Sequence, residues 1–180
     1  YGISESFEAG LYVPFAISND GNLYATGLRP RIKYIHHPEE PSIFFWGVNT
    51  EFGYSTLKVT DTMWGMELRP IMGIHTDKWL VCFNPIVNIP LSKGGMHKAA
   101  FEPALKISRK INDELAIGIE HYSNFGPVSD LQGWKNQEHA IFATADFEVK
   151  GMDVNFGVGH GYHNGEDDWV VKSIIAFPFN

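Results

Sequence analysis

Apolar and polar residues alternate along most of the chain. The segment 44–54 shows this most clearly, because Trp46, Val48 and Phe52 fall on one face while Asn49 and Glu51 fall on the other. A period of two belongs to a β-strand and differs from the 3.6-residue period of a helix. Ten segments share the pattern: residues 7–17, 24–34, 44–54, 64–75, 79–89, 101–108, 115–124, 141–148, 152–161 and 169–179. The pattern predicts an all-β protein, with about ten antiparallel strands in one domain covering residues 1–180.

The two faces of these strands differ in composition. Charged side chains stand in the middle of the polar face, whereas large residues cover the apolar face nearly end to end. A soluble lipocalin-like barrel, the second alternative for this chain, would instead have a solidly apolar interior. In an outer-membrane barrel the apolar face meets lipid and the polar face lines the lumen, and a strand of roughly 9–11 residues crosses the bilayer. We therefore expect a transmembrane β-barrel in the bacterial outer membrane, surrounded by its lipids and lipopolysaccharide.

This assignment sorts the side chains into two sets. The polar residues expected to line the lumen are Arg29, Arg31, Glu51, Glu67, Arg69, Asn84, Glu102, Lys106, Glu120, Asp146 and Asp153. The residues expected to contact lipid include Trp46, Phe52, Leu68, Phe83, Ile119 and Phe156. Opposite charges in the lumen can pair across strands, and a barrel of this strand number has a narrow interior. The expected function is a narrow channel or transporter for small solutes, or a structural barrel with a charge-paired lumen.

Aromatic residues and connection lengths bear on orientation. Aromatics near strand ends resemble the girdles found at membrane interfaces: Phe7, Tyr24, Tyr34, Tyr54, Trp64, Trp79 and Trp169. Short connections at 76–77, 112–113 and 150–151 would be periplasmic, and long ones at 92–99 and 125–137 would be extracellular. The connections at 37–42 and 19–22 do not fit, because their lengths are the reverse of those expected at their ends of the barrel. Residues 1–3 read as the tail of a strand. We therefore expect missing N-terminal sequence and twelve strands in the intact barrel.

Composition excludes several classes of function. The formal net charge of −7 argues against a nucleic-acid partner, which requires clustered Lys and Arg. The chain has one cysteine, Cys82, which we expect to behave as a small buried apolar residue. The pairs His36–His37 and His160–His163 have spacings that metals sometimes use, but such pairs rarely complete a site alone. We expect no metal and no cofactor.

Four prolines interrupt the predicted strands. Pro30, Pro70, Pro85 and Pro103 each follow a polar residue assigned to the lumen. A proline removes a donor from the strand ladder, so bulges or bends are expected. The functional interpretation is a recurring polar site, and the structural interpretation is a set of bends.

Several short stretches carry a family resemblance. Residues 68–71, 83–86, 101–104, 155–159 and 168–172 resemble a family of uncharacterised proteobacterial outer-membrane barrels, broadly similar to small transporter-like barrels linked to aromatic-compound degradation. The resemblance implies a barrel fold and brings no substrate and no functional residues. Residues 177–180 resemble the C-terminal signal read by the barrel-insertion machinery, a partner during biogenesis, except that one residue follows the last aromatic.

A second resemblance suggests chemistry. The tetrapeptide from His121 to Asn124 is similar to the active-site tetrapeptide of outer-membrane lipid A 3-O-deacylases. His121 and Ser123 lie at i and i+2, on the same lipid-facing side of a strand, where a serine nucleophile with a histidine base could meet an acyl ester. Glu138 on the next strand could orient the histidine. The alternative function is therefore a lipid A deacylase-like ester hydrolase that uses His121, Ser123 and Glu138.

Overall fold

A computed structural model describes residues 1–17, 22–36, 42–56, 62–92, 98–164 and 169–176. The strands before the middle of the chain are β1 (Phe7–Tyr12), β2 (Phe15–Ile17), β3 (Leu23–Ala25), β4 (Gly27–His36), β5 (Phe44–Ser55), β6 (Trp64–His75), β7 (Trp79–Asn84) and β8 (Val87–Pro90). Those that follow are β9 (Ala100–Phe101), β10 (Ala104–Lys110), β11 (Leu115–Asn124), β12 (Glu138–Val149), β13 (Met152–His163) and β14 (Val170–Ala176). The helical segment is one 3₁₀ turn, η1 (Trp134–Asn136). Among the described residues, no helix is long and apolar enough to cross a membrane.

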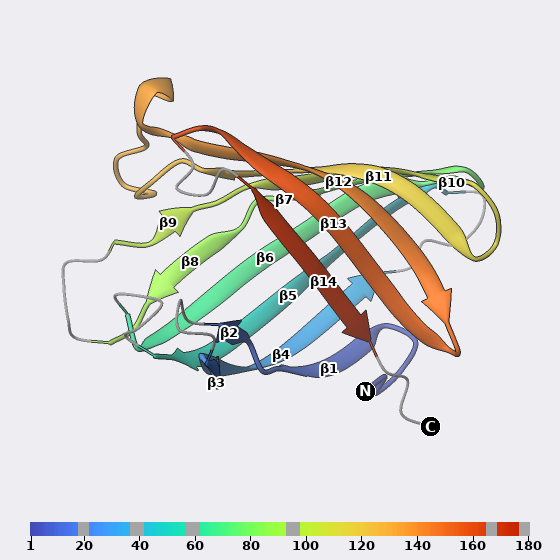
Figure 1. The fold of residues 1–180 in the computed structure, drawn as a ribbon, viewed down its shortest axis with the longest axis horizontal. Helices are drawn as coiled ribbons and strands as arrows, with labels where there is room; N and C mark the ends of the chain where they lie inside the picture. The colour runs from blue at the N-terminus through green and yellow to red at the C-terminus, as the bar shows by residue number, and fades with distance from the viewer. Residues whose placement is uncertain (18–21, 37–41, 57–61, 93–97, 165–168, 177–180) are drawn as a thin grey trace.

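The strands form one antiparallel sheet that curls into a half-barrel (Figure 1). Its order is β1-β4-β5-β6-β7-β10-β11-β12-β13-β14, and β8 and β9 continue it beside β6. Strands β2 and β3 form a separate two-stranded ribbon. The sheet therefore has ten strand positions, which confirms the all-β antiparallel prediction. No ladder joins β1 to β14 within the described residues.

Three of the predicted strands are divided at prolines. Pro14 separates β1 from β2, Pro85 separates β7 from β8, and Pro103 separates β9 from β10. The ladders on the two sides of Pro85 keep the same register, because Met72 pairs with Phe83 before it and Leu68 pairs with Val87 after it. The proline therefore interrupts hydrogen bonding without shifting the strand.

The expected bulges at prolines are only partly correct. Pro30 and Pro70 stand inside continuous strands, and Pro30 faces a gap in the β4–β5 ladder between Leu28 and Arg31. The register shift that the structure contains lies elsewhere, between His139 and Ala140 on β12. His139 pairs with His163 and Ala140 with Gly161, so Tyr162 is the extra residue of a bulge on β13.

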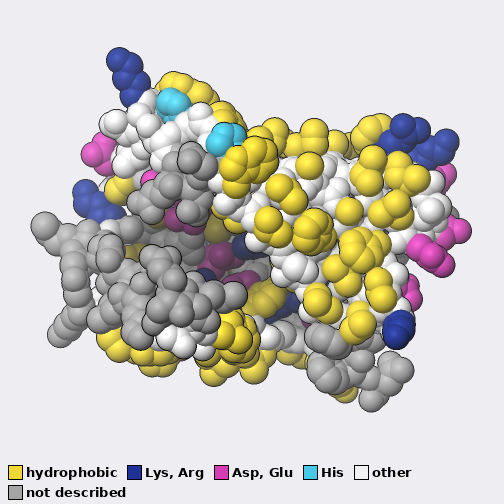
Figure 2. Space-filling view, viewed as in Figure 1, with side chains coloured by type: hydrophobic (Ala, Val, Ile, Leu, Met, Phe, Trp, Pro, Cys, Tyr) yellow, Lys and Arg dark blue, Asp and Glu magenta, His cyan; other side chains and the backbone are white. Residues whose placement is uncertain are grey.

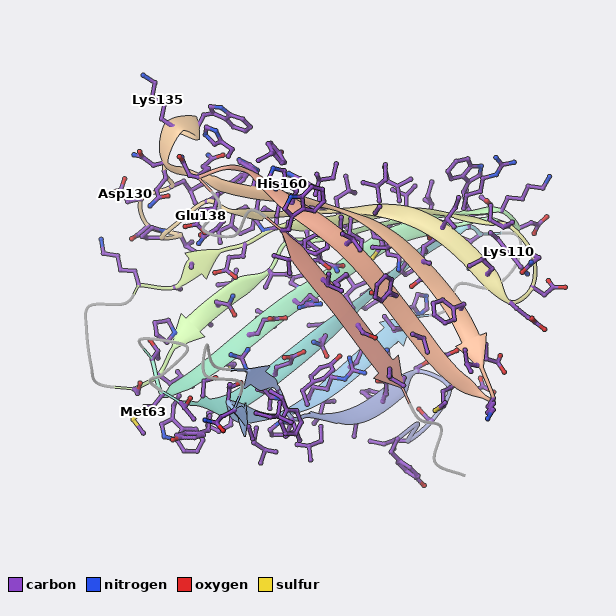
Figure 3. The ribbon with its side chains drawn as sticks, in the orientation of Figure 1. Met63, Lys110, Asp130, Lys135, Glu138 and His160 are labelled. Atoms are coloured by element: carbon purple, nitrogen blue, oxygen red, sulfur yellow. The ribbon has the colours of Figure 1, made fainter. Side chains whose placement is uncertain are left out.

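Short turns close one end of the sheet, and longer connections close the other. Lys150 and Gly151 join β12 to β13 with φ angles of 53° and 78°. Positive φ at both central residues is the feature of the tightest hairpin turns, and glycine adopts it without steric cost. Lys110 lies near the short-turn end, whereas Asp130, Lys135 and Glu138 lie at the end with the long connection (Figure 3). Short turns and the long connection thus lie at opposite ends of the sheet, as the lengths of the connections predict.

Burial in this sheet is inverted relative to a soluble domain. On the inner face Asn49, Glu51 and Glu120 are only 2%, 7% and 5% exposed, whereas on the outer face Phe52 and Ile119 are 46% and 54% exposed. Within the described part of the chain, the buried hydrophobic residues are Ile86, Ala104 and Phe142. Figure 2 shows hydrophobic side chains spread over the outer face and charged side chains gathered at the short-turn end.

The inner glycines of β13 leave room for side chains of the neighbouring strands. A methyl group at Gly159 would overlap the ring of Phe142, and one at Gly157 would press on Lys172 and Thr144. Small residues here let bulky neighbours fill the interior. Three other expectations fall on His37, on residues 177–180 and on the side chain of Tyr24, which all lie outside the described part of the structure.

Candidate functional site

A network of charged groups crosses the inner face of the last five strands of the sheet. Lys106 Nζ on β10 lies 3.3 Å from Glu120 Oε1 on β11 and 2.7 Å from Asp146 Oδ2 on β12. Lys172 on β14 forms an ion pair with Glu120, and Asn155 Nδ2 on β13 donates to Asp146 Oδ1 at 2.7 Å. We call these five residues the central cluster. It places two lysines against two carboxylates, so its formal charges cancel.

Glu120 contacts three of the other four residues of the central cluster. Besides Lys106 and Lys172, its carboxylate accepts a hydrogen bond from Tyr122 OH at 2.5 Å and one from Asn155 Nδ2 at 3.4 Å. A buried carboxylate is stable when its oxygens are satisfied in this way, because desolvation otherwise disfavours the charge. One side chain thus links β10, β11, β13 and β14.

A second group of charges lies at the β1 edge. Arg31 on β4 forms an ion pair with Glu8 on β1, and its Nη1 donates to Tyr12 OH at 2.7 Å. Lys33 Nζ lies 2.5 Å from the other oxygen of Glu8. Glu8 therefore bridges two cations, so this edge is also paired.

The other residues predicted to line the interior make isolated contacts instead of a network. Arg69 Nε lies 2.7 Å from Glu67 Oε1, and Arg29 Nη2 donates to Ser55 Oγ at 3.1 Å. Glu51 accepts from Asn49 Nδ2 at 3.1 Å. These residues face the same interior but are not joined to the central cluster.

Three other predicted residues lie toward the ends of the interior. Glu102 accepts a hydrogen bond from Asn88. Asn84 Oδ1 is 3.3 Å from the thiol of Cys82, which is half-buried on the inner face rather than packed among apolar side chains. Asp153 is exposed and borders a cavity at the short-turn end.

Two separate cavities occupy the interior. One, of about 490 Å³, opens at the short-turn end and reaches Lys106, Asp146 and Asn155. The other, of about 530 Å³, is lined by Glu51, Glu67 and other side chains toward the opposite end. The two cavities share no lining residue.

The sequence missed several partners of the network. Tyr12, Asn49, Tyr122, Asn155 and Lys172 all contribute contacts to the interior. Each stands on the polar face by the period-two rule, which was the available signal. What the sequence lacked was the register, which decides which of these groups meet.

A different site lies on the outer face of β11 and β12. Ser123 Oγ is 3.1 Å from His139 Nδ1 and 3.5 Å from His121 Nδ1. The far nitrogen of His139 is 3.2 Å from Gln137 Oε1, and that of His121 is 2.8 Å from Tyr162 OH. Ser123 therefore stands between two imidazoles, each held by a second polar group. A hydroxyl beside a held imidazole is the arrangement that activates a serine nucleophile.

Aromatic rings cover this outer site. The ring of Trp134 lies 4.5 Å from that of His139 and 4.7 Å from that of His163. The rings of His121 and His139 stack at 5.4 Å with an interplanar angle of 12°. His139 is 4% exposed as a result. The long connection after β11 thus folds back over the end of the outer face.

The expectation that Glu138 orients His121 is wrong. Glu138 pairs with Asn124 across β11 and β12, and its carboxylate accepts from Asn124 Nδ2 at 3.3 Å. Successive side chains of a strand point to opposite faces, so Glu138 lies on the inner side while its neighbour His139 contacts Ser123. The sequence carried a signal for this arrangement. Ile141 stands on the apolar face of the predicted strand, and His139, two positions earlier, shares that face, whereas Glu138 does not.

Neither site is arranged as a metal centre. No group of three or more His, Cys, Asp or Glu side chains suited to a metal ion occurs in the described ranges. His160 and His163 are not joined by a shared contact: His160 stacks on Trp169 at 5.0 Å, and His163 Nε2 is 2.6 Å from the Trp134 carbonyl oxygen.

Comparisons with protein-family models, with curated proteins and with solved structures gave no match.

The central cluster yields a stability prediction. Glu120→Ala leaves Lys106 and Lys172 facing each other without their shared carboxylate, and it should lower the free energy of unfolding by about 3–5 kcal/mol. Urea unfolding of the detergent-solubilised protein, followed by tryptophan fluorescence, measures this.

The matched control is Asp113→Ala. Asp113 pairs with Lys110 at 2.7 Å in an exposed turn, where the hydrogen bond and charge of Lys110 lower the pKa of its carboxyl. Solvent screens such a pair, so no measurable change is expected. Equal effects of the two substitutions would show that the cluster contributes little to stability.

Proposed function

We propose that this protein is an integral outer-membrane β-barrel whose interior is a narrow, charge-lined conduit for small solutes. The observation that carries the proposal is the inverted burial: inner residues such as Asn49 and Glu120 are polar and buried, while outer residues such as Phe52 and Ile119 are apolar and exposed. Exposed apolar surface on this scale is unfavourable in water and favourable in hydrocarbon. The polar interior argues against the lipocalin-like alternative.

Aromatic contacts near both ends of the strands support the membrane proposal. Near the short-turn end, the ring of Tyr34 lies 4.9 Å from Phe7 and 5.7 Å from Trp46. Toward the opposite end, the rings of Tyr54 and Trp64 are 5.4 Å apart. Aromatic side chains favour the boundary between headgroups and hydrocarbon. Two such groups, one at each end, are typical of the girdles that flank a lipid-facing band.

The proposal includes closure of the sheet between β1 and β14. An open strand edge presents unpaired N–H and C=O groups, which hydrocarbon cannot satisfy. Direct pairing of β1 with β14 would give ten strands, and two further strands at this gap would give twelve; both numbers are even, as in bacterial barrels.

The two cavities favour a restricted conduit over a wide pore. Each cavity opens toward one end, and paired charges such as Lys106 with Glu120 lie at the inner limit of the first. Because the two cavities share no lining residue, we infer that a solute passing between them would have to displace these side chains. Barrels of this size have interiors that side chains nearly fill.

Lipid exposure of the outer face can be tested with nitroxide labels on the protein reconstituted in vesicles. Labels at Phe52 and Ile119 should be accessible to oxygen dissolved in hydrocarbon. Labels at Ser108 and Asp153, on the inner face, should be accessible to a water-soluble nickel complex instead. If Ser108 proved lipid-accessible and Ile119 water-accessible, the assignment of faces would be reversed.

Conductance tests the restricted conduit. In planar bilayers the full-length protein should give current steps far smaller than those of a water-filled porin of about sixteen strands. Lys106→Ala removes a cation that bridges Glu120 and Asp146, and it should increase the step size. Large, steady steps from the unmodified protein would contradict an occluded interior.

The outer serine site supports a second candidate function, ester hydrolysis at the membrane surface. Ser123 Oγ would attack an acyl carbonyl, and His139 Nδ1, which is closer than His121 Nδ1, would accept its proton. The ester C–O bond would break and the alcohol would leave with that proton. Water would then hydrolyse the acyl-serine to release the carboxylic acid and restore Ser123. The site lies at the end of the exposed apolar stripe formed by Ile117 and Ile119, where an acyl chain could pack.

A fluorophosphonate probe tests the hydrolase candidate. The unmodified protein in detergent should be labelled at Ser123, and Ser123→Ala should abolish labelling. His139→Ala should slow labelling by about 100-fold or more, because general-base assistance is of this order. Ser129→Ala, in the exposed loop, is the control and should label normally. Retention of labelling in Ser123→Ala would exclude this site.

A further inference from the structure

The two ring nitrogens of His139 face different partners. Nδ1 lies 3.1 Å from Ser123 Oγ, and Nε2 lies 3.2 Å from Gln137 Oε1. A neutral imidazole carries one proton, so one nitrogen donates and the other accepts. His139 can act as the base for Ser123 only if Nδ1 is the nitrogen without the proton. The partner of Nε2 therefore decides whether the outer serine site can work.

The side-chain amide of Gln137 has a fixed orientation. Its Nε2 lies 2.8 Å from the backbone carbonyl oxygen of Gln132. A carbonyl oxygen only accepts, so an exchange of the amide oxygen and nitrogen would set two acceptors against each other. Oε1 of Gln137 is thus the atom that faces His139. Because Oε1 only accepts, His139 Nε2 carries the proton, and Nδ1 is left to accept from Ser123.

Backbone hydrogen bonds support the loop that carries this amide. The 3₁₀ turn η1 ends at Gln137, whose N–H donates to Trp134 O at 3.2 Å. The same carbonyl lies 2.6 Å from His163 Nε2 on β13. The N–H of Gln132 donates to Phe125 O at 2.9 Å, directly after β11. The loop between β11 and β12 therefore presents its amide from a backbone that is tied to both neighbouring strands.

The second histidine of the site makes the opposite kind of contact. Ser123 has one hydroxyl proton, and the shorter contact directs it to His139. His121 Nδ1, at 3.5 Å from the same oxygen, is then favourable only as a donor. Its Nε2 accepts from Tyr162 OH at 2.8 Å, since a phenol can donate as well as accept. The hydrogen bonds thus run in one direction, through Tyr162, His121, Ser123, His139 and Gln137.

We propose that Gln137 is the positioning residue of the outer serine site, and that it fixes His139 rather than His121 as the base. The catalytic role rests on the ester-hydrolase candidate, whereas the proton positions follow from the hydrogen bonds alone. In serine proteases a carboxylate orients the histidine, and its replacement by an amide lowers the rate about 10⁴-fold through the wrong tautomer. Here the Gln132 carbonyl occupies the amide nitrogen, so only the amide oxygen meets the imidazole.

The arrangement serves His139 before and after proton transfer. Nδ1 would take the Ser123 proton as Oγ bonds to the ester carbonyl carbon, and the imidazolium would then carry N–H groups on both nitrogens. Gln137 Oε1 accepts from Nε2 in either state. The proton on Nδ1 leaves with the alcohol when the ester C–O bond breaks, so Gln137 neither gains nor loses a proton.

Nitrogen NMR reads the proton positions directly. The full-length protein with ¹⁵N-labelled histidine is measured in detergent micelles at about pH 8, above the usual pKa of an imidazole. The signals of His139 are identified by their loss in His139→Gln. The expected spectrum shows a proton on Nε2 and none on Nδ1, and Gln137→Ala should give a mixture of the two forms. A proton on Nδ1 of His139 in the unmodified protein would overturn the inference.

Rates of fluorophosphonate labelling test the role of Gln137. Gln137→Ala should slow labelling about tenfold or more, because an unoriented base gives up part of its assistance. Gln137→Glu keeps an acceptor at Nε2 and should restore most of the rate, which a merely structural role would not predict. Asn136→Ala is the matched control, because it removes an exposed amide from the adjacent position and should label normally. Equal slowing in Asn136→Ala would reject the role.

The two measurements separate this inference from the hydrolase candidate. A proton on Nε2 of His139 without labelling of Ser123 would reject the hydrolase, and with it the positioning role, but would leave the proton positions standing. Labelling of Ser123 that Gln137→Ala does not slow would leave the hydrolase standing and reject the positioning role. Circular dichroism of each variant verifies that its sheet is intact.

Discussion

The interior of this sheet depends on the pairing of buried charges. Because the outer face carries the apolar residues, the inner face is built from polar ones, and each must find a partner inside. Glu120 illustrates the constraint, since its carboxylate is held by Lys106, Lys172, Tyr122 and Asn155. The contacts with Asn155 on β13 and Lys172 on β14 join β11 to strands that do not neighbour it in the sheet. They hold its curvature where a soluble domain would use an apolar core.

The same constraint shapes the cavities. Around Glu120 the charges balance, because two lysines meet two carboxylates. Around Glu51 the balance is incomplete, because Asn49 supplies a neutral donor and leaves its own oxygen unused. Local pairing thus differs from place to place within one polar interior.

Strand β11 places different chemistry on its two faces. Glu120 and Tyr122 point inward to the ion-pair network, whereas His121 and Ser123 point outward to a histidine-rich patch. The loop after β11 covers this patch through Trp134. Both candidate functions therefore share a strand without sharing a face, and substitutions on one face leave the other chemistry in place.

The sequence by itself determined the strands and their faces, because a side-chain period of two is a local property of the extended chain. It identified the turn at Lys150 and Gly151 and placed the charges inside. Only the tertiary structure decided which groups meet. Lys172 reaches Glu120 across 52 positions of sequence, and His139 rather than Glu138 contacts Ser123. Strand register sets these contacts, and it arises from long-range pairing that no local pattern encodes.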